Sequence, residues 1–92
     1  MPVTVLVPST LRGDAGDAKA LSVDASGTLR AVLDEMGRRW PRLERRVRDE
    51  QGALRRYMNV YIDGVDCRVL GGADAPVTAD AEVHLLPSVA GG

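Results

Sequence analysis

The sequence predicts an α+β domain in which a mixed sheet of four to five strands wraps one main helix. Three observations support this prediction. Short segments of alternating or β-branched residues lie towards both ends of the chain, and a segment whose apolar residues have helical spacing lies between them. The 92 residues allow one hydrophobic core, because a chain of this size buries only about two-thirds of the surface it exposes when unfolded.

The composition is that of a globular domain. Hydrophobic residues make up 45% of the chain and charged residues 27%, which excludes intrinsic disorder. Trp40, Tyr57 and Tyr61 are the only aromatic residues, so the core must be built from aliphatic side chains. The net charge of −1 gives no overall attraction to nucleic acid or to an anionic membrane. We therefore expect neither as a partner.

The first two strands are expected at residues 3–7 and 19–23. The first segment is rich in β-branched valine and threonine, and Pro8 ends it because proline cannot donate a ladder hydrogen bond. In the second segment alternation places Leu21 and Val23 on one face. We expect these two strands to form a hairpin.

The main helix is expected to follow residues 26–28, whose hydroxyl groups suit an N-cap. Its buried face is predicted to consist of Leu29, Val32, Leu33 and Met36. The helix should fade over residues 37–40, because Pro41 disfavours helical geometry in the residue before it. Proline suits a first helical position, so a second, shorter helical turn is expected over residues 42–48.

Three further segments are predicted as strands. Residues 57–63 alternate and lead into the turn-forming Asp63-Gly64, residues 67–70 suit a short fourth strand, and residues 82–86 form a last strand closed by Pro87. The order β-β-α-β-β-β with a single amphipathic helix is that of the β-grasp, or ubiquitin-like, fold.

The chain ends in a glycine pair. We expect residues 1–87 to form the β-grasp domain and residues 88–92 to form a flexible tail, since this end carries no charged or bulky side chain. Gly91 and Gly92 let the main chain pass through a slot too narrow for a Cβ atom. Such a terminus suits a carboxylate that must enter another protein's active site.

Four stretches, spread over nearly the whole chain, identify a family by resemblance. They are Val3-Thr4-Val5 with Pro8-Ser9-Thr10-Leu11-Arg12, then Gly27-Thr28-Leu29-Arg30-Ala31-Val32, then Arg56-Tyr57-Met58-Asn59-Val60-Tyr61-Ile62-Asp63-Gly64, and Leu85-Leu86-Pro87-Ser88-Val89-Ala90-Gly91-Gly92. In these stretches the chain resembles the MoaD/ThiS family of ubiquitin-like sulfur carriers, and within it the CysO type. The last stretch is the most specific, because it joins the glycine pair to a preceding strand and a proline.

The resemblance implies a chemical role for the terminus. An ATP-dependent ubiquitin-activating-like enzyme, an adenylyltransferase and sulfurtransferase, would adenylate the Gly92 carboxylate, and a sulfur donor would then displace AMP to leave a thiocarboxylate. Activation is needed because a carboxylate is a poor electrophile and oxide a poor leaving group. Val89, Ala90 and Gly91 would bind the partner as the tail threads into it. We expect no bound cofactor, since the ATP is consumed by the enzyme.

The resemblance also implies partners further along the pathway. A PLP-dependent cysteine synthase would accept the sulfur and a metallopeptidase would then release cysteine, so the chain would be a carrier and co-substrate rather than an enzyme. Other recipients, including the molybdenum cofactor, thiamin and secondary metabolites, remain open. Two alternatives also remain: a protein modifier joined to lysines through Gly92, and a molybdopterin synthase small subunit whose tail stays docked in a larger subunit.

A docking patch for the activating enzyme is predicted from strand alternation. If Val83 and Leu85 point inward, His84 and Leu86 lie on the opposite face, and Tyr61 joins them if its strand is adjacent. Scattered surface residues without a role are an equally strong interpretation, because single exposed apolar residues are ordinary.

The stretch from residue 38 to residue 56 is basic, with eight arginines against three carboxylates and a local net charge of about +5. It suits an acidic partner or RNA, but it lacks the glycine and aromatic pattern of an RNA-binding module. We favour a solvated face.

Cys67 and His84 are each the only residue of their type. A lone cysteine excludes an intrachain disulfide, a four-cysteine zinc site and a plant-type iron–sulfur cluster, and a lone histidine leaves a histidine-based metal site without partners. A structural role for Cys67 is favoured over a persulfide, because no base or second cysteine is near it in the sequence.

Residues 1–7 contain no leader-like segment, so a cytoplasmic location is expected.

Overall fold

The fold contains seven strands, two α-helices and three short 3₁₀-helices in the part of the chain that this computed structural model describes, residues 2–88. The elements are β1 (Val3–Leu6), η1 (Ser9–Ala15), β2 (Ala20–Val23), β3 (Gly27–Thr28), α1 (Leu29–Arg39), α2 (Pro41–Val47), β4 (Met58–Ile62), β5 (Val65–Asp66), η2 (Cys67–Val69), η3 (Gly72–Asp74), β6 (Pro76–Val77) and β7 (Glu82–Pro87).

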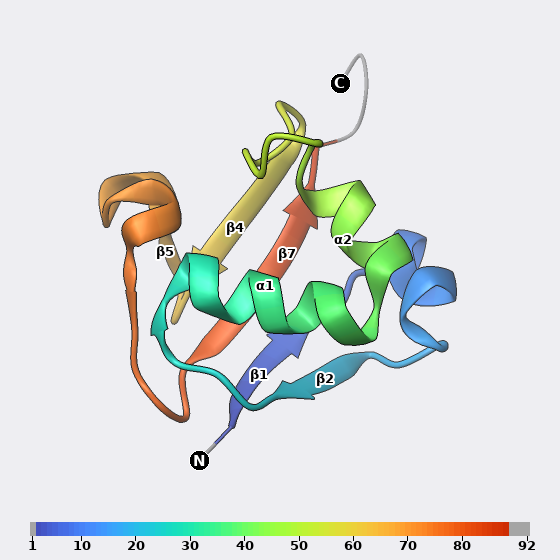
Figure 1. The fold of residues 1–92 in the computed structure, drawn as a ribbon, viewed down its shortest axis with the longest axis horizontal. Helices are drawn as coiled ribbons and strands as arrows, with labels where there is room; N and C mark the ends of the chain where they lie inside the picture. Colours follow the sequence, from blue (N-terminus) through green and yellow to red (C-terminus); the bar gives the residue numbers. More distant parts are fainter. Residues whose placement is uncertain (1, 89–92) are drawn as a thin grey trace.

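The main sheet has the strand order β2-β1-β7-β4-β5. β1 pairs parallel with β7, whereas β2 with β1, β4 with β7, and β5 with β4 pair antiparallel. Helices α1 and α2 lie over one face of this sheet (Figure 1). The α+β class, the mixed sheet and the β-grasp arrangement are therefore confirmed, and the predicted bounds of the first, second, third and last strands are correct to within one residue.

The core lies between the sheet and the helices. Alternate residues of the three central strands are buried, as the sequence pattern predicts, and α1 contributes its predicted apolar face. The buried residues of these elements are Val3, Val5, Met58, Val60, Ile62, Val83, Leu85, Leu29, Val32, Leu33 and Met36. Burial of each large aliphatic side chain contributes roughly 1.5–3 kcal/mol, so this cluster is the main source of stability.

The two helices begin and end where the sequence signals place them. The hydroxyl oxygen of Thr28 accepts a hydrogen bond of 3.2 Å from the backbone N–H of Ala31, which caps α1. The chain leaves helical geometry at Trp40, and Pro41 takes the first position of α2. The predicted second helical turn is thus confirmed.

One predicted strand is wrong. Residues 67–70 do not form a strand, because Cys67–Val69 form the 3₁₀-helix η2 and the short strand β5 lies just before it. The carboxylate of Asp66 accepts a hydrogen bond of 2.9 Å from the backbone N–H of Arg68. This local cap satisfies a donor that a strand would need for its ladder, so the chain turns instead.

Two short features have no counterpart in the prediction. Residues 9–15, between the two predicted strands of the hairpin, form η1, and β3 with β6 makes a second, two-stranded sheet beside α1. Both features are too short for periodicity to reveal.

Arg48 joins the two helices from within the basic stretch. Its side chain is only 8% exposed, its Nε donates to Glu44 at 2.6 Å, and its Nη2 donates to Asp34 of α1 at 2.8 Å. Gly37 makes room for this cluster, because a Cβ atom there would come within 2.8 Å of the Glu44 side chain. The solvated-face interpretation is therefore wrong for Arg48, although it holds for the exposed Arg45 on the same helix.

Removal of the Glu44 carboxylate should destabilise the protein. We expect Glu44→Ala to lower the free energy of unfolding by about 1–3 kcal/mol, because Arg48 then stays buried with one partner fewer. Alanine is the best helix former, so helix propensity cannot explain such a loss. Urea unfolding measures the change, and Arg45→Ala is the matched control with an effect near zero. Equal effects of the two variants would contradict the role of the ion cluster.

Candidate functional site

The described part of the chain ends at the middle strand of the main sheet. Ser88, the last described residue, follows β7, which lies between β1 and β4. The backbone N–H of Ser88 donates a 2.6 Å hydrogen bond to the carbonyl oxygen of Tyr57. The predicted reacting residue Gly92 and its neighbours Val89, Ala90 and Gly91 lie outside the described residues. Their roles, and the domain boundary at residue 87, stay predictions.

The three residues of the predicted docking patch lie together on the face of the sheet away from the helices. His84 pairs directly with Tyr61 on β4, and Leu86 lies one inward-facing residue further along β7. All three are half-buried rather than fully exposed. On the other side His84 pairs with Leu6 of β1, also half-buried. We name Leu6, Tyr61, His84 and Leu86 the outer-face patch.

Leu6 is a member of this patch that the sequence did not reveal. Alternation within the first strand places it on the outer face, but only the parallel pairing of β1 with β7 brings it beside His84. That pairing joins residues about eighty positions apart, and no local signal specifies it.

A groove of about 650 Å³ lies beside the end of β7. We call it the tail-base groove, and its lining consists of Pro8, Ser9, Thr10, Leu11, Arg46, Tyr57, Leu86, Pro87 and Ser88. Most of the lining is apolar, and Tyr57 remains 46% exposed within it. Arg46 is held by an ion pair of 3.2 Å with Asp14 of η1. The groove thus offers a partner a mainly apolar surface next to Ser88.

A row of polar side chains reaches Ser88 from the edge of the sheet. Asn59 Nδ2 donates to Ser88 Oγ at 2.9 Å, and Arg68 Nη2 donates to Asn59 Oδ1 at 2.8 Å. Arg68 also makes a two-pronged contact with Asp66, at 3.1 and 2.8 Å. The hydrogen bond from the Arg68 side chain, with that from its backbone N–H, holds the pKa of Asp66 below its ordinary value. Asp66 is therefore charged at neutral pH.

Cys67 stands between Asp66 and Arg68 in the chain and is 1% exposed. Burial, followed by the negative charge of Asp66, raises the pKa of the Cys67 thiol above its ordinary value. The thiol is therefore protonated at neutral pH, which makes it a poor nucleophile.

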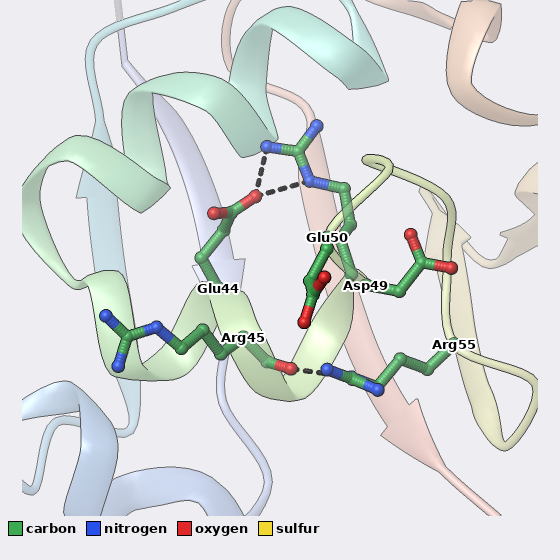
Figure 2. A pocket seen from close by; sticks show the side chains of 6 residues that line it. Glu44, Arg45, Asp49, Glu50 and Arg55 are labelled. Atoms are coloured by element: carbon green, nitrogen blue, oxygen red, sulfur yellow. Dashed lines mark hydrogen bonds and ion pairs between the residues drawn. The ribbon is translucent and has the colours of Figure 1, made fainter.

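The basic stretch also borders a hollow of about 440 Å³, which is lined by three carboxylates and three arginines (Figure 2). Glu44 and Arg45 come from α2, Asp49 and Glu50 from the loop after it, and the Arg55 Nε donates to the carbonyl oxygen of Arg45 at 2.6 Å. Because the charges in the hollow are mixed in sign, the structure does not form a uniform basic surface there.

Neither a metal centre nor a membrane span was found within residues 2–88. No three side chains of His, Cys, Asp or Glu in that range gather closely enough to hold an ion. The helices of the same range are too short and too polar to cross a bilayer.

Comparison with known proteins finds a family model and relatives that are similar to this chain over nearly its whole length. Residues 5–92 match the family model described as the ThiS family. The sulfur carrier protein CysO of Mycobacterium tuberculosis is 38% identical over 95 aligned positions, which cover all of both chains.

Solved structures agree with this finding. The Amycolatopsis orientalis BexX/CysO complex contains a chain with a TM-score of 0.88 and 33% identity, the match covering 98% of this chain and 99% of that one. H. volcanii small archaeal modifier protein 1 gives a TM-score of 0.80 at 26% identity, with 95% of this chain and 97% of that one covered. Since the family model spans almost the whole sequence and a relative matches from end to end, the chain belongs to the ThiS family.

Proposed function

We propose that this chain is a sulfur carrier whose working group is the carboxylate of Gly92. The observation that supports this most directly is its end-to-end similarity, at 38% identity, to a protein named as a sulfur carrier. The family match runs through the glycine pair at residue 92. The placement of β7 in the middle of the sheet agrees with such a role, because Ser88, four positions before Gly92, lies at one end of the domain.

The proposed chemistry has two steps. The Gly92 carboxylate attacks the α-phosphate of ATP and releases pyrophosphate, which leaves an acyl-adenylate. A sulfide-level sulfur donor then attacks the acyl carbon, the bond to AMP breaks, and a thiocarboxylate remains. An activating enzyme binds and consumes the ATP, so the carrier is a co-substrate without a cofactor or catalytic role of its own.

The outer-face patch and the tail-base groove are the proposed docking surfaces for the activating enzyme. Ser88 lines the groove, and Leu86 belongs to both surfaces, so a partner that takes the terminus into its active site meets them as well. The solved complex of a related CysO with BexX supports the expectation of a protein partner. The proposed sulfur acceptor is a PLP-dependent cysteine synthase followed by a metallopeptidase, all in the cytoplasm.

A second candidate function is conjugation to lysines of other proteins through Gly92. The similarity to a protein named small archaeal modifier protein 1 favours it, because the same activated terminus would react with an amine in place of sulfide. Higher-mass conjugates in cell extracts would distinguish this function. The third alternative, a molybdopterin synthase small subunit, would instead purify as a stable stoichiometric complex.

Cys67 is not the proposed sulfur-bearing group. Its thiol is buried and protonated at neutral pH, and a persulfide there would have to form and leave through the packed core.

Removal of Gly92, or extension of the chain beyond it, should abolish sulfur loading. Intact mass spectrometry after incubation with ATP, sulfide and the activating enzyme should show the mass gain of one oxygen-to-sulfur exchange for the native chain only. Circular dichroism should be unchanged, since the core lies within residues 3–85. Sulfur loading of a tagged, uncleaved chain would refute the mechanism.

A charged residue in the docking surface should weaken recognition by the activating enzyme. We expect Leu86→Glu to raise the KM for the carrier about tenfold with little change in kcat, because it places a carboxylate on both the outer-face patch and the groove. Ala79→Glu is the matched control, since this exposed residue lies in the loop before β7, at the far end of that strand. An unchanged KM for Leu86→Glu would remove the docking proposal.

Cys67 should be dispensable for sulfur loading and slow to alkylate. We expect Cys67→Ala to load sulfur at the native rate, and iodoacetamide to leave the native thiol unmodified at pH 7. Because the raised pKa keeps the thiol protonated, alkylation should accelerate only in the alkaline range. Loss of loading in Cys67→Ala, with the fold intact, would indicate that the thiol takes part.

A further inference from the structure

Ser88 is held by the structure at two atoms, although it lies beyond the last strand. Its N–H donates to the Tyr57 carbonyl oxygen and its Oγ accepts from Asn59, both on the β4 side. The residue before it, Pro87, has no N–H and cannot donate to the ladder. The two contacts of Ser88 therefore supply the anchorage that the proline removes from the end of β7.

We propose that Asp66, Arg68 and Asn59 form a clamp on Ser88 that fixes where the terminal segment begins. In this role Asn59 and Arg68 are positioning residues for the reaction at Gly92. The inference rests on the proposed function, because it assigns these side chains to the delivery of the terminal carboxylate.

The hydrogen bonds from Arg68 to Asn59 and from Asn59 to Ser88 can run in only one direction. The guanidinium of Arg68 has only donors, so the Asn59 side chain must turn its carbonyl oxygen towards Arg68. Its amide nitrogen then faces Ser88 and can only donate, which makes the serine hydroxyl the acceptor. Each side chain thus determines the orientation of the next one along the row.

Arg68 is itself fixed by Asp66. The guanidinium meets the carboxylate through Nε and Nη2, a fork geometry that restricts both planar groups. The same carboxylate caps the backbone N–H of Arg68 at the start of η2. The sharp turn from β5 into η2, which replaces the predicted strand, is what brings Arg68 within reach of Asn59 on β4.

A fixed starting point matters because the proposed reacting residue lies close to it in the chain. Gly92 is four positions after Ser88, and extended chain spans at most about 3.6 Å per residue, so Gly92 reaches no further than roughly 14 Å from Ser88. A displaced or reoriented Ser88 therefore shifts the reachable volume relative to a docked partner. Misplacement of a reacting group lowers the rate of the chemical step even where binding is unchanged.

The clamp is expected to contribute little to the stability of the fold. The side chains of Arg68 and Asp66 are 64% and 23% exposed, and exposed ion pairs contribute little to folding. Loss of the clamp should leave unfolding by urea almost unchanged. Its effect should appear in kcat rather than in KM, the opposite of the effect expected for the outer-face patch.

The test uses the full-length carrier with its activating enzyme. Asn59→Ala and Ser88→Ala should each lower kcat for thiocarboxylate formation about tenfold, and the kcat of the double variant should be no lower than that of either single one. KM should be unchanged in Asn59→Ala, because Asn59 does not line the tail-base groove. Ser88→Thr, which keeps the hydroxyl, should retain the native kcat. Hydrogen exchange of the Ser88 amide should be faster in Asn59→Ala than in the native chain.

Asp66→Asn separates positioning from a direct charge contact. If Arg68 merely attracts an acidic partner, removal of the neighbouring carboxylate should lower KM or leave the kinetics unchanged. If Arg68 positions Asn59, the loss of its fork should lower kcat as Asn59→Ala does. Asparagine can still accept the backbone hydrogen bond at the start of η2, so the turn should be retained.

The outcomes distinguish the clamp from the function on which it rests. A native chain that loads no sulfur with any activating enzyme would refute the proposed function, and the exchange rate of the Ser88 amide would still report whether the clamp exists. A native chain that loads sulfur, with native kcat in Asn59→Ala and Ser88→Ala, would overturn the clamp alone. A raised KM with unchanged kcat in Asn59→Ala would also overturn the clamp, because Asn59 lies outside the tail-base groove and would then itself be a docking contact.

Discussion

The pairing of β7 with β1 on one side and β4 on the other is the constraint on which the rest of the structure depends. It places the last strand of the chain in the middle of the sheet, so Ser88 lies between η1 and the start of β4 rather than at an edge. The outer-face patch, the tail-base groove and the row from Asp66 to Ser88 all adjoin this exit. One strand register thereby brings residues of β1, β4 and β7, which are far apart in the sequence, close to one another.

Local sequence patterns predicted those features whose causes are local. Alternation specified the facing of His84 and Leu86, helical spacing specified the buried face of α1, and the geometry of Pro41 specified the second helix. The same patterns could not reveal that Leu6 lies beside His84, nor that η1 closes one side of a groove. Those relations depend on pairing between distant strands, which a periodicity does not encode.

The errors have physical causes of the same kind. Residues 67–70 have strand-like composition, but the Asp66 carboxylate offers the backbone a competing hydrogen bond, and the local cap prevails over propensity. From the count of charges alone, residues 38–56 were predicted to form a solvated face. The count could not show that Arg48 alone meets carboxylates from two different helices, because Asp34 and Glu44 become neighbours only after α2 folds back on α1. Burial of that charge follows from tertiary structure.

A carrier of the proposed kind has a further constraint on its surfaces. Gly91 and Gly92 have no side chains, so the reacting terminus carries almost no information by which one partner can be told from another. Discrimination must then come from the residues around Ser88. Since a single terminus enters one active site at a time, the activating enzyme and the sulfur acceptor must use these surfaces in turn. Each complex must therefore dissociate readily, which favours small docking surfaces and a well-fixed starting point for the tail over extensive contact.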